Sequence, residues 1–256
     1  MINLMKCEVL KARKSLPIKI LTILIIVLSV AMAFSHLNYV GSPYVKELNI
    51  PLEGYNTFFS SMNDSATIEL LGIMIASILV CTDFENRTIQ SEISAGYSRL
   101  QILLSKVIVF GITFFFVYLP IPLLRATIQG LLYKFGREMT METITHMALS
   151  FGVVILIGIA INTMTILLAF IIKKSVITIG ASIVIITLVG NAFLSFGSVS
   201  DDFRGFLSKT PIGLSKYIAE GQYNSDVLFT ATIISIASIV FMIILTYVIF
   251  RKLDLK

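Results

Sequence analysis

Residues 151–172 read FGVVILIGIAINTMTILLAFII, a block of 22 positions without a charged side chain. An α-helix rises about 1.5 Å per residue, so about 20 apolar residues cross a hydrocarbon core roughly 30 Å thick. Only helices and closed barrels cross a bilayer, because lipid offers no hydrogen-bond partner to an open backbone. Barrel strands alternate apolar and polar positions, and this block does not. It therefore predicts a membrane-spanning helix.

The composition extends this prediction to the whole chain. Hydrophobic residues make up 56% of the 256 positions and charged residues 14%, whereas a soluble domain carries about 25% charge. A water-soluble globular fold and a disordered chain are both excluded. The two cysteines, Cys7 and Cys81, are too few for a disulfide scaffold.

The predicted fold class is an all-α polytopic membrane protein that forms a single transmembrane domain. Lys173 and Lys174 alone separate two of its apolar blocks, which predicts a tight hairpin there. Pro120 and Pro122 should kink the third span. The motif Ala31-Met32-Ala33 leaves a cleaved signal peptide open as an alternative for the first block. Six spans are expected, at about 17–34, 66–82, 107–133, 146–172, 175–196 and 227–250.

The distribution of basic residues predicts the orientation. If the N-terminus is cytoplasmic, 13 of the 20 Lys and Arg residues fall in inner segments. Cytoplasmic loops carry such an excess, so both termini are expected in the cytoplasm of a bacterial cell with the chain in its plasma membrane. The net charge of +5 is explained by this topology and by attraction to anionic membrane lipid, and it requires no nucleic-acid partner.

The polar stretch after the second span, residues 83–106, reads DFENRTIQSEISAGYSRLQILLSK. Its TIQSEISA part predicts a short helix, and Gly96 suits the left-handed residue that ends it. Ser98 followed by Gln101 is a capping-box pattern that starts the next helix. A solvated loop is the alternative, but a rigid helical connector indicates a docking element.

Three other segments flank the spans. Residues 1–16 predict an interfacial amphipathic helix, with a disordered basic tail as the alternative. Residues 199–226 predict an outer loop with short helices, the second of which starts at Pro211. Residues 36–65 are expected to be irregular because Gly, Pro and Asn recur there.

The sequence contains no P-loop, no H-E-x-x-H, no G-x-S-x-G and no C-x-x-C pattern. We therefore predict no catalytic residue, no metal ligand and no cofactor bound by this chain. Glu69 is the one acid expected at possible membrane depth, which disfavours an ion-coupled carrier. Polar uncharged residues in the fourth and fifth spans either bond between helices or line a conduit.

Several residues of the polar stretch carry a resemblance to a known family. Asp83-Phe84-Glu85, Thr88-Ile89, Gly96-x-Ser98-Arg99 and Lys106 resemble the intracellular coupling segment of type-2 ATP-binding-cassette permeases. The closest similarity is to exporter permeases of the bacteriocin-immunity, bacitracin and phenol-soluble-modulin types. Arg87 departs from the pattern, which has a glycine before the threonine.

The resemblance implies a permease that moves hydrophobic or amphipathic peptides. Two separate ATPase subunits would hold ATP and Mg, and a second copy or a sister permease would complete the complex. The residues implied to couple to the ATPase are Asp83, Phe84, Glu85, Arg87, Thr88, Ile89, Gly96, Ser98 and Arg99. Those implied to line the translocation path are Thr178, Ser182, Thr187, Asn191 and Asn162.

A second hypothesis is a receptor or immunity protein that binds a peptide at its outer face without moving it. The structured outer loop 199–226 motivates this alternative. A membrane-embedded enzyme is weaker, because no nucleophile, metal set or paired acids are present.

Overall fold

The computed structural model describes residues 2–35, 53–190, 209–219 and 225–253, and the regular elements within these ranges are all helices. In chain order they are α1 (Ile2–Lys14), α2 (Leu16–Ser35), α4 (Gly54–Met62), α5 (Ser65–Glu85), α6 (Thr88–Ser94), α7 (Arg99–Tyr118), α8 (Pro120–Tyr133), α9 (Met141–Ile172), α10 (Ser175–Ser182), a π-helical continuation (Ile183–Val189), α13 (Pro211–Ala219) and α14 (Ser225–Lys252).

Five stretches among these helices are long and apolar enough to cross a membrane. They are Leu16–Ser35, Ser65–Glu85, Arg99–Tyr133, Met141–Ile172 and Asp226–Lys252. The all-α polytopic fold class is therefore confirmed. The span expected at 175–196 is represented by a shorter apolar helix, Ser175–Leu188, and residues 191–196 lie outside the described residues. The total of six spans thus stays a prediction.

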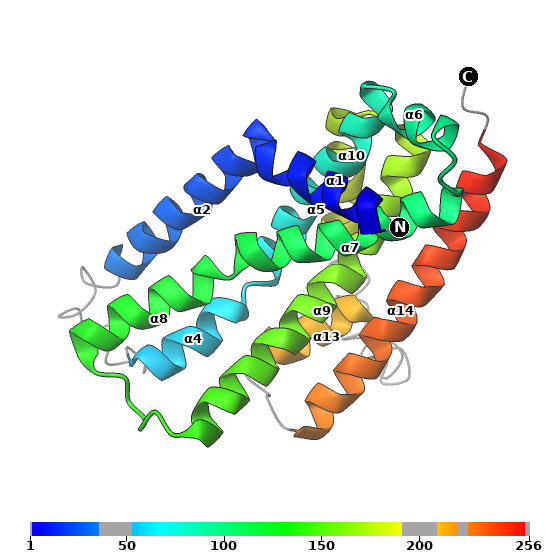
Figure 1. Ribbon diagram of the computed structural model, residues 1–256. Helices are drawn as coiled ribbons and strands as arrows, with labels where there is room; N and C mark the ends of the chain where they lie inside the picture. Colours follow the sequence, from blue (N-terminus) through cyan, green and yellow to red (C-terminus); the bar gives the residue numbers. More distant parts are fainter. Residues whose placement is uncertain (1, 36–52, 191–208, 220–224, 254–256) are drawn as a thin grey trace.

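The long helices lie alongside one another, and the polar elements gather at one end of the bundle. In Figure 1, α6 and the end of α14 share the upper right, whereas α4 and the start of α9 lie at the opposite end. The α1 helix contacts α7. The start of α7 in turn bonds the end of α14, so the first and last described helices approach the same end. Assigning this end to the cytoplasm remains a prediction.

The third span bends at its prolines, as expected. The α7 helix ends at Tyr118 and α8 begins at Pro120, while Leu119 between them keeps helical angles (φ −49°, ψ −41°). A proline has no N–H to donate and its ring crowds the preceding turn. The chain is therefore kinked without being unwound, and α8 leaves at an angle to pack against α2 and α4.

The prediction of an irregular segment at 36–65 is wrong for its described end, where α4 forms. Phe58, Phe59 and Met62 are buried. A Cβ placed on Gly54 would lie 2.7 Å from the Ala126 carbonyl oxygen of α8. A nine-residue helix is marginal by itself, so packing on α8, which the sequence pattern did not reveal, stabilises it.

The N-terminal segment is a helix, so the alternative of a disordered tail is wrong for residues 2–14. It packs on the protein through Leu4, Glu8 and Ala12, while Ile2 and Val9 of the predicted apolar face stay exposed. This leaves an apolar face available to a membrane surface. The burial of Glu8 was not expected from the sequence.

Candidate functional site

Three consecutive residues, Asp83, Phe84 and Glu85, occupy the last turn of α5, because this helix continues beyond the predicted end at residue 82. Helical geometry turns each residue about 100° from the previous one. The three side chains therefore point in different directions and reach different helices. The short helix α6 follows directly, so any force on α6 reaches this turn first.

Asp83 belongs to a cluster of five charged residues, Glu8, Lys11, Asp83, Glu92 and Lys106, which we call the charge cluster. The buried Lys106 ammonium of α7 bonds both Asp83 and Glu8. The Lys11 ammonium of α1 lies 2.5 Å from Glu8 Oε1 and 2.8 Å from Glu92 Oε1 of α6. Four helices (α1, α5, α6 and α7) are thus joined by ion pairs at this end of the bundle.

Ammonium groups lie among the carboxylates of the charge cluster and offset their mutual repulsion. Oxygens of Glu8, Asp83 and Glu92 lie within 4.8 Å of one another, and the two lysines fill the space among them. Unpaired carboxylates at this spacing would repel strongly after burial. The arrangement therefore requires the lysines as much as the acids.

The pKa values of Glu8, Lys11 and Glu92 show how burial competes with the ion pairs of the charge cluster. Burial raises the pKa of Glu8, but the ammoniums of Lys106 and Lys11 outweigh burial and hold that pKa below its usual value. Burial lowers the pKa of Lys11, but hydrogen bonds to Glu8 and Glu92 raise it overall. For Glu92 burial outweighs the attraction of Lys11, with repulsion from Glu8 adding to it, so its pKa is raised. When the pH falls, Glu92 is therefore protonated before Glu8.

Phe84 and Glu85 reach two further helices. The Phe84 ring meets the Phe170 ring of α9 edge-on with centroids 5.4 Å apart, and Phe170 meets Phe250 of α14 at 4.8 Å. Glu85 Oε1 accepts hydrogen bonds from the backbone N–H (2.8 Å) and hydroxyl (3.0 Å) of Ser175, the first residue of α10. A carboxylate at a helix N-terminus satisfies free N–H groups and favours the helix dipole.

Arg87 separates α5 from α6 and adopts a left-handed conformation with φ +56°. This is the position at which the family pattern has a glycine, the residue that adopts such angles without strain. Thr88 starts α6, and Ile89 anchors it with a fully buried side chain. Arg87, which replaces the glycine of the family pattern, therefore has a backbone conformation that favours glycine.

We expect Arg87→Gly to stabilise the protein by about 0.5–1 kcal/mol, because a left-handed residue with a Cβ is strained. Arg87→Ala removes the same guanidinium but keeps the Cβ, and should show no such gain. Thermal unfolding in detergent compares the two variants. Equal stability of the glycine and alanine variants would contradict the strain argument.

The end of α6 and the start of α7 confirm the predicted local structure. Gly96 is left-handed with φ +90°, and its N–H donates to the Ile93 carbonyl oxygen at 2.9 Å. Ser98 and Gln101 form the reciprocal capping box. Arg99 then donates to the carbonyl oxygens of Phe250 (2.5 Å) and Arg251 (2.7 Å), which ties the start of α7 to the end of α14.

The face of α6 that points away from the helix bundle, together with the turn after it, is exposed. A Cβ placed on Gly96 would meet no atom within 4 Å, so this turn is open to an approaching surface. The residues exposed around it are Asn86, Arg87, Ser91, Ser94, Ala95, Gly96 and Ser98. The predicted coupling residues therefore divide into an inward set that holds other helices and an outward set that could receive a partner.

The expected path residues lie mainly at contacts between helices of this chain. Thr178 Oγ1 lies 3.3 Å from Cys81 Sγ of α5, and Ser182 is buried. Thr187 of the π-helical segment donates to Glu69 Oε2 at 3.3 Å. The buried Asn162 amide of α9 donates to the Gly158 carbonyl oxygen at 2.9 Å. Asn191 lies outside the described residues.

Sequence reasoning missed the charge cluster, although parts of its signal were visible. Glu8 and Lys11 stand three residues apart, a spacing that places them together on a helix. Lys106 stands out in the sequence only as part of the family pattern, and Glu92 is one of the buried residues of α6. No local pattern shows that these residues meet, because up to 98 positions separate them in the chain.

The fold and this end of the bundle define a multi-pass helical membrane protein in which the last turn of α5 and the short polar helix α6 after it are linked by side chains to several other helices. The chain matches the family model for ABC-2 family transporter protein over residues 4–190 and belongs to that family. It is thus a transmembrane permease subunit of an ABC transporter, and the family implies an ABC ATPase partner.

The chain is also similar to a curated protein over most of its length. The chain is 24% identical over 235 residues to the uncharacterized protein YhcI of Bacillus subtilis (strain 168). The match covers 83% of this chain and 74% of that protein.

Proposed function

We propose that this permease is the membrane half of an exporter that moves hydrophobic or amphipathic peptides and is driven by ATPase subunits docked on the exposed face of α6. The sequence has no P-loop of its own, so the driving energy has to arrive through a protein contact. Two ATPase subunits, holding ATP and Mg, would serve two permeases, either two copies of this chain or this chain and a sister subunit.

The observation that carries the proposal is the set of links made by Asp83, Phe84 and Glu85. Through them and the charge cluster, the position of α6 is tied to α1, α7, α9 and α10. A rigid shift of α6 on ATP-driven closure would therefore be transmitted to several spans together. Packed, ion-paired elements of this kind move as units. This end of the bundle would face the cytoplasm of a bacterial cell.

The proposed path runs along α10 and its π-helical continuation, which carry Thr178, Ser182 and Thr187, and it includes Asn162 of α9. Asn191, the other proposed path residue, lies outside the described residues. The side chains of the path residues are uncharged, which suits a substrate with a large apolar surface. The π-helical segment Ile183–Val189 supports this location, because π-helical turns are rare and are frequent at functional sites. Opening the path would require α10 to move away from α5.

The docking claim is tested by charge changes on the exposed residues that flank α6, Arg87 before it and Ala95 after it, which hold no other helix. Arg87→Glu and Ala95→Arg should abolish co-purification with the ATPase and ATP-dependent peptide uptake into inside-out vesicles. Glu142→Arg, an exposed change in the first turn of α9 at the other end of the bundle, serves as the control. Wild-type ATPase binding and transport in both the Arg87 and the Ala95 variant would refute docking at this face.

The same vesicles separate the exporter from the alternative of a peptide receptor. An exporter accumulates a fluorescent amphipathic peptide only when ATP is present and loses this activity when a non-hydrolysable analogue replaces ATP. A receptor binds the peptide equally in both conditions and moves none.

A further inference from the structure

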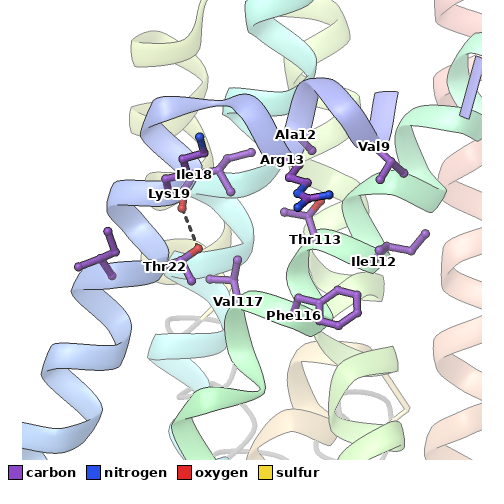
Figure 2. A pocket seen from close by; sticks show the side chains of 11 residues that line it. Val9, Ala12, Arg13, Ile18, Lys19, Thr22, Ile112, Thr113, Phe116 and Val117 are labelled. Carbon is purple, nitrogen blue, oxygen red and sulfur yellow. Dashed lines mark hydrogen bonds between the residues drawn. The ribbon is translucent and has the colours of Figure 1, made fainter. Parts of the chain in front are cut away.

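A groove of about 520 Å³ lies where α1, α2 and α7 meet. Figure 2 shows α1 crossing above it, α2 on one side and α7 on the other. The chain turns sharply at Ser15, between the end of α1 and the start of α2, and this elbow creates the space. Its volume is within the range of small-molecule sites, about 300–1,000 Å³.

Most of the side chains that line the groove are apolar. Ala12, Ile18 and Val117 are buried and form its floor, while the rim includes Phe116, whose side chain is 63% exposed. These side chains, with Ile23 and Ile112, give the groove an apolar interior. The exposed apolar face of α2 continues from it and lines a neighbouring hollow through Ile20, Ile23, Leu24, Val27 and Leu28.

Two cations border this apolar interior. Arg13 at the end of α1 and Lys19 in the first turns of α2 both line the groove and are exposed. In Figure 2 the Arg13 side chain reaches down beside Thr113 of α7. Within the described part of the chain, neither cation takes part in any of the carboxylate ion pairs, which involve Lys11 and Lys106.

We propose that this groove binds an anionic phospholipid, with its phosphate between Arg13 and Lys19 and an acyl chain along Ile23, Ile112 and Phe116. A cation pair at the mouth of an apolar groove complements a ligand with an anionic head and a hydrocarbon tail. The inference requires neither the proposed export function nor the proposed orientation.

The site adjoins the charge cluster through α1. Lys11 of the charge cluster and Arg13 of the groove are two residues apart on this helix, and Ala12 between them packs inward. A bound lipid would therefore hold the end of α1 against α7, on which Lys106 pairs with Glu8. The lipid would fix the position of a helix that is connected to α6.

The test measures lipid binding to the full chain by native mass spectrometry from detergent, with phosphatidylglycerol as the anionic probe. Phosphatidylcholine with the same acyl chains is the zwitterionic comparison. For the double variant Arg13→Ala with Lys19→Ala, phosphatidylglycerol binding should fall about 30-fold, which corresponds to about 1 kcal/mol for each of two cations. Phosphatidylcholine binding should hardly change.

Two further variants make the result decisive. Lys14→Ala with Lys252→Ala removes the same charge from exposed positions outside the groove, and it should keep wild-type phosphatidylglycerol affinity. Thr113→Trp fills the groove and should weaken both lipids. The proposal is overturned if the Arg13 and Lys19 variant binds phosphatidylglycerol normally, or if the charge-matched control weakens it equally, since the attraction would then be spread over the surface.

Discussion

Replacing Lys106 by methionine is expected to destabilise the protein by about 3–5 kcal/mol, enough to prevent recovery of folded protein from the membrane. The side chain is 1% exposed and its ammonium bonds both Glu8 and Asp83. Methionine fills a similar volume but leaves two buried carboxylates without their closest cation, and removal of one partner from a buried ion pair has a cost of this size. The yield of monodisperse protein and its unfolding temperature in detergent measure the effect.

A compensating variant shows whether the loss arises from unpaired charge. Glu8→Leu combined with Lys106→Met removes one acid together with the cation and leaves Asp83 beside Lys11, whose ammonium lies 3.5 Å away. This double variant should recover most of the stability, because replacing a buried pair by apolar groups is often neutral. Lys6→Met, on the exposed side of α1, should have little effect. If the double variant is as unstable as Lys106→Met, loss of packing and not charge explains the result.

The second large effect is expected at the crossing of α5 and α9. A Cβ placed on Gly72 would overlap the buried amide of Asn162. Gly72→Val is therefore expected to force the two helices apart and to destabilise the fold by about 1–3 kcal/mol or more, the usual range for overpacking a core. The unfolding temperature in detergent checks this expectation.

Two comparisons isolate the steric cause. Gly152→Ala, on α9, adds a Cβ where no atom lies within 4 Å, and it should be neutral or stabilise by up to about 1 kcal/mol through helix propensity. Asn162→Ala combined with Gly72→Ala should be less destabilised than the sum of the single variants, since the alanine at 162 makes room. Strict additivity would show that the two residues do not compete for the same space.

The local structure of the polar stretch could be predicted because its signals are local. The glycine stop at Gly96 and the capping box of Ser98 with Gln101 depend only on residues a few positions apart. The kink at Pro120 follows from the chemistry of proline itself. The Lys173–Lys174 hairpin likewise appears as expected, with Lys173 left-handed at φ +61°.

Other features could not be predicted because their causes lie far away in the chain. The α4 helix depends on the close approach of Gly54 to α8, and Glu8 is buried only because Lys106 comes from α7 to meet it. An isolated acid near the N-terminus resembles a solvated surface residue. Thr178 and Asn162, both expected to line the path, could be placed on their helices, but not against their partners Cys81 and Ile68 of α5.

The sequence by itself determined that the chain crosses a membrane as helices and carries a short capped helix between two spans, since hydropathy and capping depend on neighbouring residues. The tertiary structure alone decided which helices contact this short element and the last turn of α5 before it. Ion pairs and ring contacts between distant segments require each side chain to arrive from a different helix, and only the packed bundle brings them within bonding distance.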